Sequence, residues 1–209
     1  MQTIEKLDLT KSDPNYYRAY QQPAIVDLDP YYYLSFQGQC SPEDPYFMGA
    51  IEHLYAVAYA VKFLTKSEDN DFVVPKMEGQ WWIAGGAEAQ AQFESTPKEE
   101  WYWRIMIRMP DFVEAEHFFR ALQSVKKKKP ELVHIDQVKF ELINEGTVAQ
   151  GLHIGSYDHE KPTVDKLHSF IGSEGMKING IHHEIYLSDP RKTAPEKLKT
   201  IIRYPIQKN

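Results

Sequence analysis

The stretch GIHHEIYLSDP, residues 180–190, has an acid in the middle of a pattern that otherwise predicts a strand. Side chains alternate between the two faces of a strand, so His182, Glu184 and Tyr186 would share one face and His183 the other. A carboxylate among apolar and aromatic groups suits a general base, because such surroundings favour proton uptake. The same carboxylate could hold an organic cation by charge pairing, with cation–π contacts from aromatic rings.

Two other roles for Glu184 compete with these. A basic group such as Arg104 could pair with it and make it structural, because a buried carboxylate must be paired or protonated. Metal binding is a second alternative, since His153, His182 and His183 supply further ligand types. However, His182 and His183 would point to opposite faces, and the pattern H-E-x-x-H of zinc enzymes is not present. We therefore expect no metal and no cofactor.

Aromatic side chains are concentrated near two further strand-like runs. Aromatics make up 13% of the chain, and its four tryptophans lie between residues 81 and 103. Core packing is the ordinary role of a tryptophan, because its ring buries a large apolar area. Alternation nevertheless separates Trp81 from Trp82, so at least one tryptophan should face a ligand site.

Hydrophobic periodicity indicates the same order of elements in each half of the chain: strand, helix, strand, strand. In the first half we expect these elements at 31–38, 41–66, 76–84 and 100–109. In the second half we expect them at 147–157, 160–175, 180–189 and 200–206. A linking helix at 111–130 and a short strand at 137–143 would join the halves.

This order predicts an α+β fold of duplicated strand–helix–strand–strand modules with pseudo-twofold symmetry and a central ligand groove between the two helices. Residues 1–24 would form an N-terminal arm, and residues 25–209 the domain itself. Within the domain, the first half is expected at about 25–110 and the second at about 131–209. Because one chain would contain both halves, we expect a monomer.

Composition argues against several classes of function. The net charge of −6 is unsuited to nucleic-acid binding, which needs clustered Lys and Arg. The single cysteine, Cys40, permits no disulfide framework and has no evident base partner for nucleophilic catalysis. The N-terminus has no secretory pattern, and no run approaches the roughly 20 apolar residues of a membrane span. A cytoplasmic protein that binds neither membrane nor nucleic acid is the expectation.

The segment HHEIYLSDPRKTAPEKLKTIIRYPI, together with YAVAYAVKF and EGQWW, resembles the GyrI-like small-molecule-binding domains. The resemblance covers nearly all of residues 20–208. In many such proteins the domain follows a DNA-binding helix-turn-helix, for which the first 24 residues are too short. The aromatic pattern is similar to that of a stand-alone subgroup, the cyclopropanoid cyclopropyl hydrolases. These enzymes open the three-membered ring of DNA-alkylating natural products of the yatakemycin type.

The resemblance implies roles for particular residues. Glu184 would deprotonate a water that attacks the cyclopropane carbon, in a site without a cofactor. Tyr186, Tyr55 or His182 would stabilise the developing phenolate at the far end of the substrate by hydrogen bonding. The remaining ligand-binding side chains are expected to be Tyr33, Trp82, Trp103 and His153.

Three functions are therefore open at this stage. The first is a hydrolase of planar alkylating toxins with Glu184 as general base. The second is a non-catalytic module that binds or sequesters planar aromatic or cationic drugs. The third is an interaction protein of the kind that gives the family its name, one that docks on gyrase.

Overall fold

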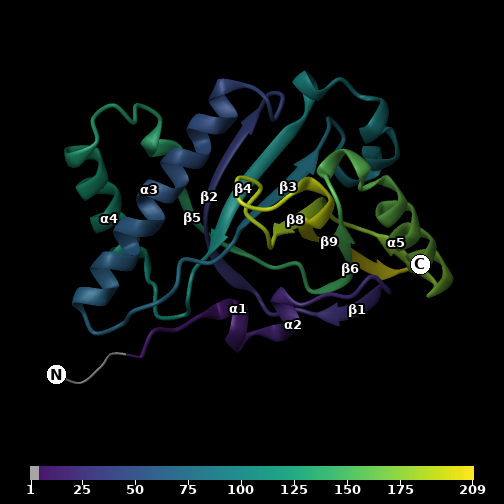
Figure 1. Cartoon of the computed structure of the whole chain (residues 1–209), viewed down its shortest axis with the longest axis horizontal. Coiled ribbons are helices and arrows are strands. Elements are labelled where there is room, and N and C mark those ends of the chain that lie inside the picture. Colours follow the sequence, from purple (N-terminus) through teal and green to yellow (C-terminus); the bar gives the residue numbers. More distant parts are fainter. Residues whose placement is uncertain (1–4) are drawn as a thin grey trace.

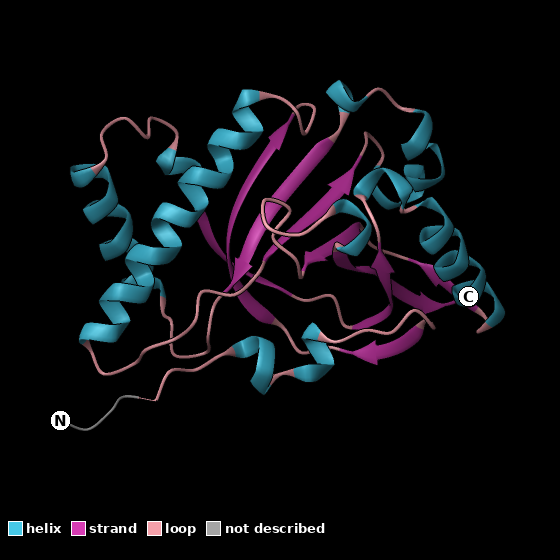
Figure 2. Cartoon of the chain, viewed as in Figure 1, coloured by secondary structure: helices cyan, strands magenta, loops and turns pink. Residues whose placement is uncertain are grey.

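The computed structural model describes residues 5–209, and the side chains of all of these except residues 90, 91 and 94 (Figure 1). Residues 1–4 of the expected N-terminal arm lie outside the described residues. The fold is α+β, as expected, with helices packed on a nine-stranded sheet whose pairings are all antiparallel (Figure 2). Its strands are β1 (Ala24–Asp27), β2 (Tyr31–Gln39), β3 (Met77–Trp82), β4 (Tyr102–Arg108), β5 (Lys139–Ile143), β6 (Thr147–Ile154), β7 (Met176–Ile178), β8 (His182–Tyr186) and β9 (Lys199–Lys208).

The helices are of two kinds. The α-helices are α1 (Leu9–Ser12), α2 (Pro14–Tyr17), α3 (Pro45–Ser67), α4 (Ala115–Lys128) and α5 (Lys161–Ser173). The 3-10 helices are η1 (Gly86–Ser95), η2 (Lys98–Glu100), η3 (Ile135–Gln137), η4 (Tyr157–His159) and η5 (Pro195–Lys197).

The strands β2, β3 and β4 lie together on one side of the sheet, and β6, β8 and β9 lie together on the other. Eight strands follow the order β1-β6-β9-β8-β3-β4-β2-β5, and β7 pairs with β9 beside this path. In each half the chain runs strand, long helix and two further strands, namely β2, α3, β3, β4 and then β6, α5, β8, β9. The halves meet where β3 pairs with β8, with Gly79 opposite Glu184. The short strands β1 and β7 were not expected from the sequence.

The long helices and the sheet form two layers. α3 and α4 pack against β2, β3 and β4 through a large apolar core, and α5 packs on β6 and β9 through a smaller one. Both cores lie on the sheet face that carries Glu184, because residues directly opposite each other on paired strands share a face. Trp81 of the larger core pairs with His182, and Ile202 of the smaller core pairs with Glu184. Figure 1 shows α3 and α5 on either side of the central strands. We call this the helix face, and the opposite side the arm face.

Helix α3 is long and has many apolar residues. Among the described residues it is the one helix that is long and apolar enough to cross a membrane, with a mean hydropathy of 1.2. No such run was expected from the sequence. Its Leu54, Val57 and Val61 are fully buried against the sheet. This packing makes α3 a core helix of the domain.

Capping residues set where the helices begin. Asp44 caps α3 by accepting a hydrogen bond from the backbone N–H of Tyr46 at 2.7 Å, and Pro45 occupies the first turn. The linking helix starts later than expected, at Ala115 and not at residue 111. Its N-cap is Glu114, which forms a reciprocal capping box with His117, so the residues before it remain a turn.

The N-terminal arm covers the other face of the sheet. Its Tyr16 and Tyr17 are buried beside Met106, Ile185 and Ile201. The Tyr16 hydroxyl donates to Glu78 Oε2 at 2.5 Å and lies 2.6 Å from the Tyr33 hydroxyl. The arm therefore closes over polar side chains as well as apolar ones.

Beneath the arm lies a buried charge network, here called the His183 cluster, made of Glu78, Glu145, His183 and Arg203. His183 Nε2 donates to Glu78 and Nδ1 donates to Glu145, both at 2.9 Å. The negative charges of Glu78 and Glu145 are thus balanced by the positive charges of Arg203 and of protonated His183. Burial disfavours the charged imidazole, but the carboxylates of Glu145 and Glu78 outweigh it and raise the pKa of His183 to about 9.

Stability should therefore fall in alkaline solution. An unfolded histidine loses its proton near its usual pKa of 6.5 and the folded one near 9, so the stabilisation is full below about pH 6.5 and lost through pH 9. A shift of this size corresponds to about 3 kcal/mol in the free energy of unfolding. Urea unfolding at pH 6 and pH 9.5 measures it.

His183→Gln should be less stable at pH 6 and should lack most of this pH dependence. The exposed histidine variant His159→Gln should keep it. Equal pH slopes for the native protein and His183→Gln would contradict the assignment of an imidazolium to the cluster.

Candidate active site

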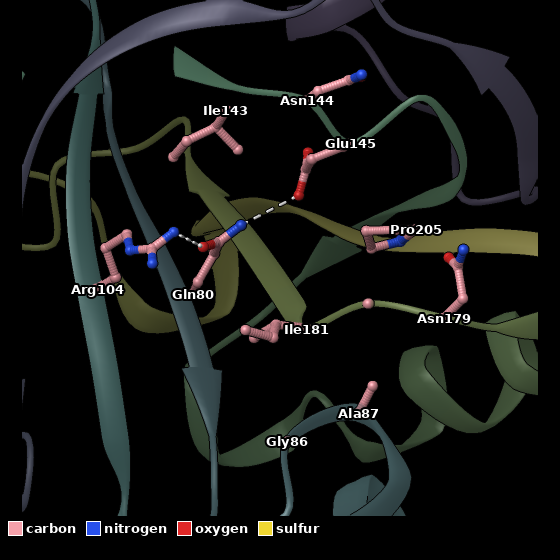
Figure 3. Close-up of a pocket in the computed structure, with 11 residues that line it drawn as sticks. Gln80, Gly86, Ala87, Arg104, Ile143, Asn144, Glu145, Asn179, Ile181 and Pro205 are labelled. Carbon is pink, nitrogen blue, oxygen red and sulfur yellow. Dashed lines mark hydrogen bonds between the residues drawn. The ribbon is translucent and has the colours of Figure 1, made fainter. Parts of the chain in front are cut away.

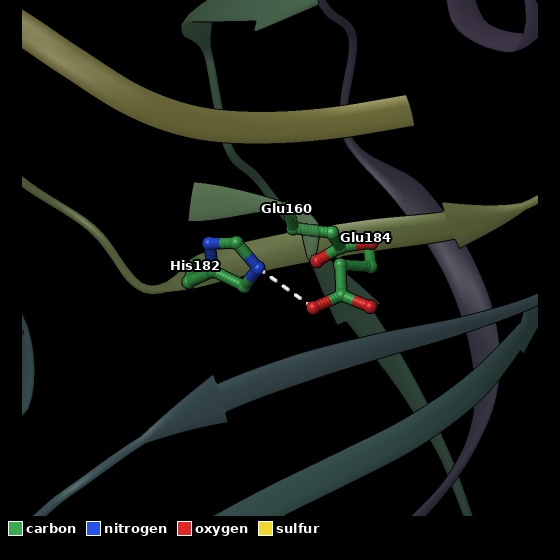
Figure 4. A group of neighbouring side chains, drawn as sticks. All are labelled: Glu160, His182 and Glu184. Carbon is green, nitrogen blue, oxygen red and sulfur yellow. Dashed lines mark hydrogen bonds and ion pairs between the residues drawn. The ribbon is translucent and has the colours of Figure 1, made fainter. Parts of the chain in front are cut away.

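Strand β8 places Glu184 and His182 side by side on the helix face (Figure 4). Glu184 Oε1 lies 2.7 Å from His182 Nε2, and His182 Nδ1 lies 2.6 Å from the Tyr204 hydroxyl. An ionised carboxylate only accepts hydrogen bonds, so Nε2 must carry a proton. In the neutral imidazole Nδ1 then accepts from the Tyr204 hydroxyl. This chain of donors holds the Glu184 carboxylate in one orientation.

Tyr186 completes the row that alternation predicted. Its hydroxyl accepts a hydrogen bond from Trp81 Nε1 at 2.9 Å. Burial, and then the charge of Glu184, raises the pKa of Tyr186 well above its usual range, so the phenol stays protonated. Gly79 makes room for this contact, because a Cβ there would lie 2.6 Å from the Tyr186 hydroxyl and 2.9 Å from Trp81 Nε1.

A second acid joins the pair from the loop between β6 and α5. Glu160, Glu184 and His182 each offer a ligand-type atom, and these three atoms lie within 4.8 Å of one another. Glu160 is 91% buried, at a relative exposure of 9%, and its Oε1 has no hydrogen-bond partner among the described residues. Burial, followed by the charge of Glu184, raises the pKa of Glu160 far above its usual range. The raised pKa favours the protonated, neutral form of Glu160.

The three side chains are of types that bind divalent metals, but their arrangement is that of an acid–base cluster. Two ligands of a tetrahedral zinc ion, each about 2.1 Å from the metal, lie about 3.4 Å apart. His182 and Glu184 are in direct contact at 2.7 Å, which leaves no space for an ion between them. As they stand, His182 and Glu184 are bonded to each other by a hydrogen bond.

Aromatic rings surround this acid–base cluster. The Trp81 ring lies edge-on to Trp101 with centroids 6.2 Å apart, and Phe93 lies 4.3 Å from Trp101. Phe93 also faces His182 with the two rings nearly parallel, and Tyr157 lies edge-on to Tyr186. Tyr157 is 40% exposed, whereas Trp81 is buried, so the rings reach solvent at Tyr157.

The structure places only part of the expected ligand-binding set near Glu184. Tyr55 is on α3, on the helix face, and burial raises the pKa of its phenol. His153 bonds Thr163 Oγ1 and the Ser156 carbonyl, at 3.0 and 3.1 Å. It thus holds the loop that carries Tyr157 and Glu160, and does not itself join the acid–base cluster.

Three expected wall residues lie elsewhere. Tyr33 is on the arm face, bonded to Tyr16. Trp82 is also on the arm face, where it stacks on Tyr102, because its neighbour Trp81 is the one that pairs with His182. Trp103 is on the helix face but is 0% exposed and packs in the core against Phe36 and Phe47.

Arg104 is not the basic group that contacts Glu184, because that group is His182. Arg104 pairs with Gln80 and approaches Glu141 on the arm face, away from Glu184.

Sequence reasoning missed several residues of the site: Glu160, Trp81, Trp101, Phe93, Tyr157 and Tyr204. A signal for Glu160 was present, since the turn SYDHEKP at 156–162 is polar and acidic and follows a glycine. The choice between Trp81 and Trp82 needed the register of β3 against β8, which no local pattern supplies.

A cavity of about 410 Å³ lies on the arm face, lined by Gln80, Arg104, Glu145, Asn179 and neighbouring residues (Figure 3). Its polar groups satisfy one another: Arg104 donates to Gln80 at 3.2 Å, and Gln80 donates to Glu145 at 3.2 Å. Glu145 in turn pairs with His183. The cavity borders the His183 cluster, in which the acids are paired with Arg203 and His183. We therefore take the group around Glu184 as the candidate active site.

Comparisons with known proteins agree with this organisation. The family model described as the GyrI-like small molecule binding domain matches residues 21–207. The crystal structure of an uncharacterized conserved protein from Listeria innocua is 34% identical, with a TM-score of 0.89 over 97% of this chain and 100% of that one. A structure described as a hydrolase from Listeria innocua is 33% identical, with a TM-score of 0.84 over the same shares of both chains.

More distant likeness is confined to the fold. The C-terminal domain of EcmrR is 13% identical, with a TM-score of 0.59 over 90% of this chain and 98% of that one. No curated protein sequence matches the chain.

The close approach at Gly79 gives a direct test of the site's packing. Gly79→Ala should force Tyr186 and Trp81 apart and lower the free energy of unfolding by about 1–3 kcal/mol, the usual effect of overpacking. Gly151→Ala is the matched control, since a Cβ at this position on β6 meets nothing within 4 Å. Urea unfolding compares the two variants, and tryptophan fluorescence should change in Gly79→Ala alone. Equal stabilities would show that the contact at Gly79 is not restrictive.

Proposed function

Since this chain belongs to the GyrI-like small-molecule-binding domain family, we propose that it is a cofactor-independent hydrolase. Its proposed substrates are planar alkylating genotoxins of the yatakemycin type, whose cyclopropane ring it would open. The observation that carries the proposal is the Glu184 carboxylate, oriented by His182 and surrounded by aromatic rings. The relatives from Listeria innocua described as hydrolases, at 33% and 32% identity, support it.

The chemistry follows from the groups around Glu184. The carboxylate takes a proton from a water molecule, whose oxygen bonds to the cyclopropane CH₂ carbon. A ring C–C bond breaks, and its electron pair moves through the conjugated ketone to give a phenolate. Ring strain in the substrate already favours this step, so the protein must only place the water and the planar ring system. Trp81, Trp101 and Phe93 are the rings that would stack on that system.

The phenolate needs a hydrogen-bond donor away from the base. Of the three residues expected in this role, His182 already uses its Nε2 proton on Glu184. Tyr186 and Tyr55 remain, and burial raises the pKa of each, so both stay protonated donors. We further propose that the protein acts as a monomer in the cytoplasm, on a planar aromatic or cationic small molecule.

A non-catalytic binder is the second candidate. The negative charge of Glu184 beside several aromatic faces would suit an organic cation, by charge pairing and cation–π contact. In such a module the carboxylate acts by its charge alone and no substrate is consumed. Glu184→Gln separates the two functions, because the amide keeps the size of the side chain but cannot take up a proton.

The first test is incubation of the protein with a cyclopropane-bearing alkylator of the duocarmycin class, followed by mass spectrometry. The native protein should add one water to the compound. Glu184→Gln should do so about 10²–10⁴-fold more slowly, the usual contribution of a general base. Glu174→Gln, an exposed acid at the end of α5, should match the native rate.

If the native protein binds the compound and returns it unchanged, the hydrolase proposal fails. Binding of a cationic aromatic dye then tests the second candidate. Glu184→Gln should weaken that binding by about 1–3 kcal/mol, as expected for the loss of a partly desolvated charged contact.

A further inference from the structure

Glu160 occupies a position that its structural context does not explain. It is the N-cap residue of α5, where a carboxylate usually bonds the free backbone N–H groups, yet its side chain makes no capping hydrogen bond. Instead the carboxyl group turns toward another acid, Glu184 (Figure 4). Its Oε1 is buried and unpartnered. A carboxyl group at this position would stabilise the fold more by capping the helix than by lying beside a second carboxyl group. We therefore look for a chemical role of Glu160.

The surroundings of Glu160 determine which of the two acids holds the proton. The ionisable groups that face it are Glu184, His182 and Tyr186 on β8, and Tyr157 and Asp158 in the preceding turn. Two adjacent carboxylates cannot both ionise in a desolvated site, so the pair keeps one proton. Glu184 is held as an acceptor by His182, and the proton therefore stays on Glu160. A base and an acid thus lie together before any substrate binds.

We propose that Glu160 is the general acid partner of Glu184, and that this pair also hydrolyses aromatic oxiranes, strained rings whose leaving atom is part of the ring itself. This inference rests on the proposed function, because it uses the same base, the same water and the same aromatic walls.

The position of the leaving atom distinguishes the two substrates. In the cyclopropane compounds the electron pair ends on a ketone oxygen several bonds from the carbon that is attacked, so an acid beside the base has no atom to protonate. In an oxirane the leaving oxygen is bonded directly to that carbon. The proton must then be delivered within a few ångströms of the attacking water. The carboxyl atoms of Glu160 and Glu184 lie within 4.8 Å of each other, so one small ring bound beside them could meet both the base and the acid.

The oxirane reaction balances within the pair. Glu184 takes a proton from water as the water oxygen bonds to a ring carbon. The C–O bond breaks, and the leaving oxygen takes the proton of Glu160, which gives a vicinal diol. Glu184 now carries a proton and Glu160 is ionised. Transfer of that proton back to Glu160 restores the starting state, so no external acid or base is consumed.

The experiment compares two substrates on the same proteins. The native protein, Glu160→Gln, Glu184→Gln and the control Glu174→Gln are each incubated with 2-naphthyloxirane and with the cyclopropane alkylator, in water enriched in ¹⁸O. Mass spectrometry measures labelled diol and labelled ring-opened product against the rates without protein. Glutamine copies the size and neutrality of protonated Glu160 but has no transferable proton, so a structural role would survive the change.

The expected result is selective. Glu160→Gln should lose at least about 100-fold in oxirane opening, at the lower end of general acid contributions, and no more than about 10-fold in cyclopropane opening. Glu184→Gln should lose both activities, and Glu174→Gln neither. Thermal unfolding of Glu160→Gln near the native midpoint would exclude general loss of structure.

Three outcomes overturn the inference. If the native protein opens the cyclopropane but not the oxirane, the proposed function stands and this extension falls. If Glu160→Gln slows both substrates equally, Glu160 is a positioning residue and not the acid. If the native protein opens neither compound, the proposed function fails together with the extension.

Discussion

The pairing of β3 with β8 is the contact on which the rest of the structure depends. It joins the two halves of the sheet and places Gly79 opposite Glu184 and Trp81 opposite His182. With these pairs in register, the hydroxyl of Tyr186 has space above Gly79 and a donor in Trp81. The same pairing sets Gln80 opposite His183 on the arm face. One short ladder therefore positions the chemistry of both faces.

Buried acids are paired differently on the arm face and on the helix face. In the His183 cluster each acid meets a base, so burial leaves a neutral and rigid group. Around Glu184 two acids, Glu184 and Glu160, lie beside a single imidazole, that of His182. Two buried carboxyl groups with one basic partner are costly, and natural proteins keep such arrangements where they serve a purpose. This difference in the ratio of acids to bases is the physical reason for placing the active site on the helix face.

Much of the fold could be predicted from the sequence, because helices and strands leave periodic apolar patterns. α3 and α5 were expected from such patterns, and so were the strands that flank them. β1 and β7 were missed because strands of four and three residues are too short to show a period. The start of α4 was misplaced because Asp111 and Glu114 both resemble caps, and only the contact with His117 decides between them.

The site was predictable only where its geometry is local. Alternation along β8 correctly grouped His182, Glu184 and Tyr186, since it needs no knowledge of a partner strand. The tryptophans required cross-strand register, and Trp82 was chosen where Trp81 lies beside His182. Glu160 approaches Glu184 through the tertiary fold alone, from a loop 24 residues away in the sequence. Tyr33 was expected at the ligand because of the family resemblance, whereas in the structure its hydroxyl contacts that of Tyr16 in the arm.

Strand β8 carries ionisable side chains on both of its faces, with His183 and Glu184 as neighbours. A slip of one residue would exchange them. Glu184 would then enter the space now filled by His183, against the carboxylates of Glu78 and Glu145, while His183 would face the helices. Three acids would meet without the imidazolium that separates two of them now. The buried charges of β8 therefore disfavour the misaligned pairing in the folded sheet.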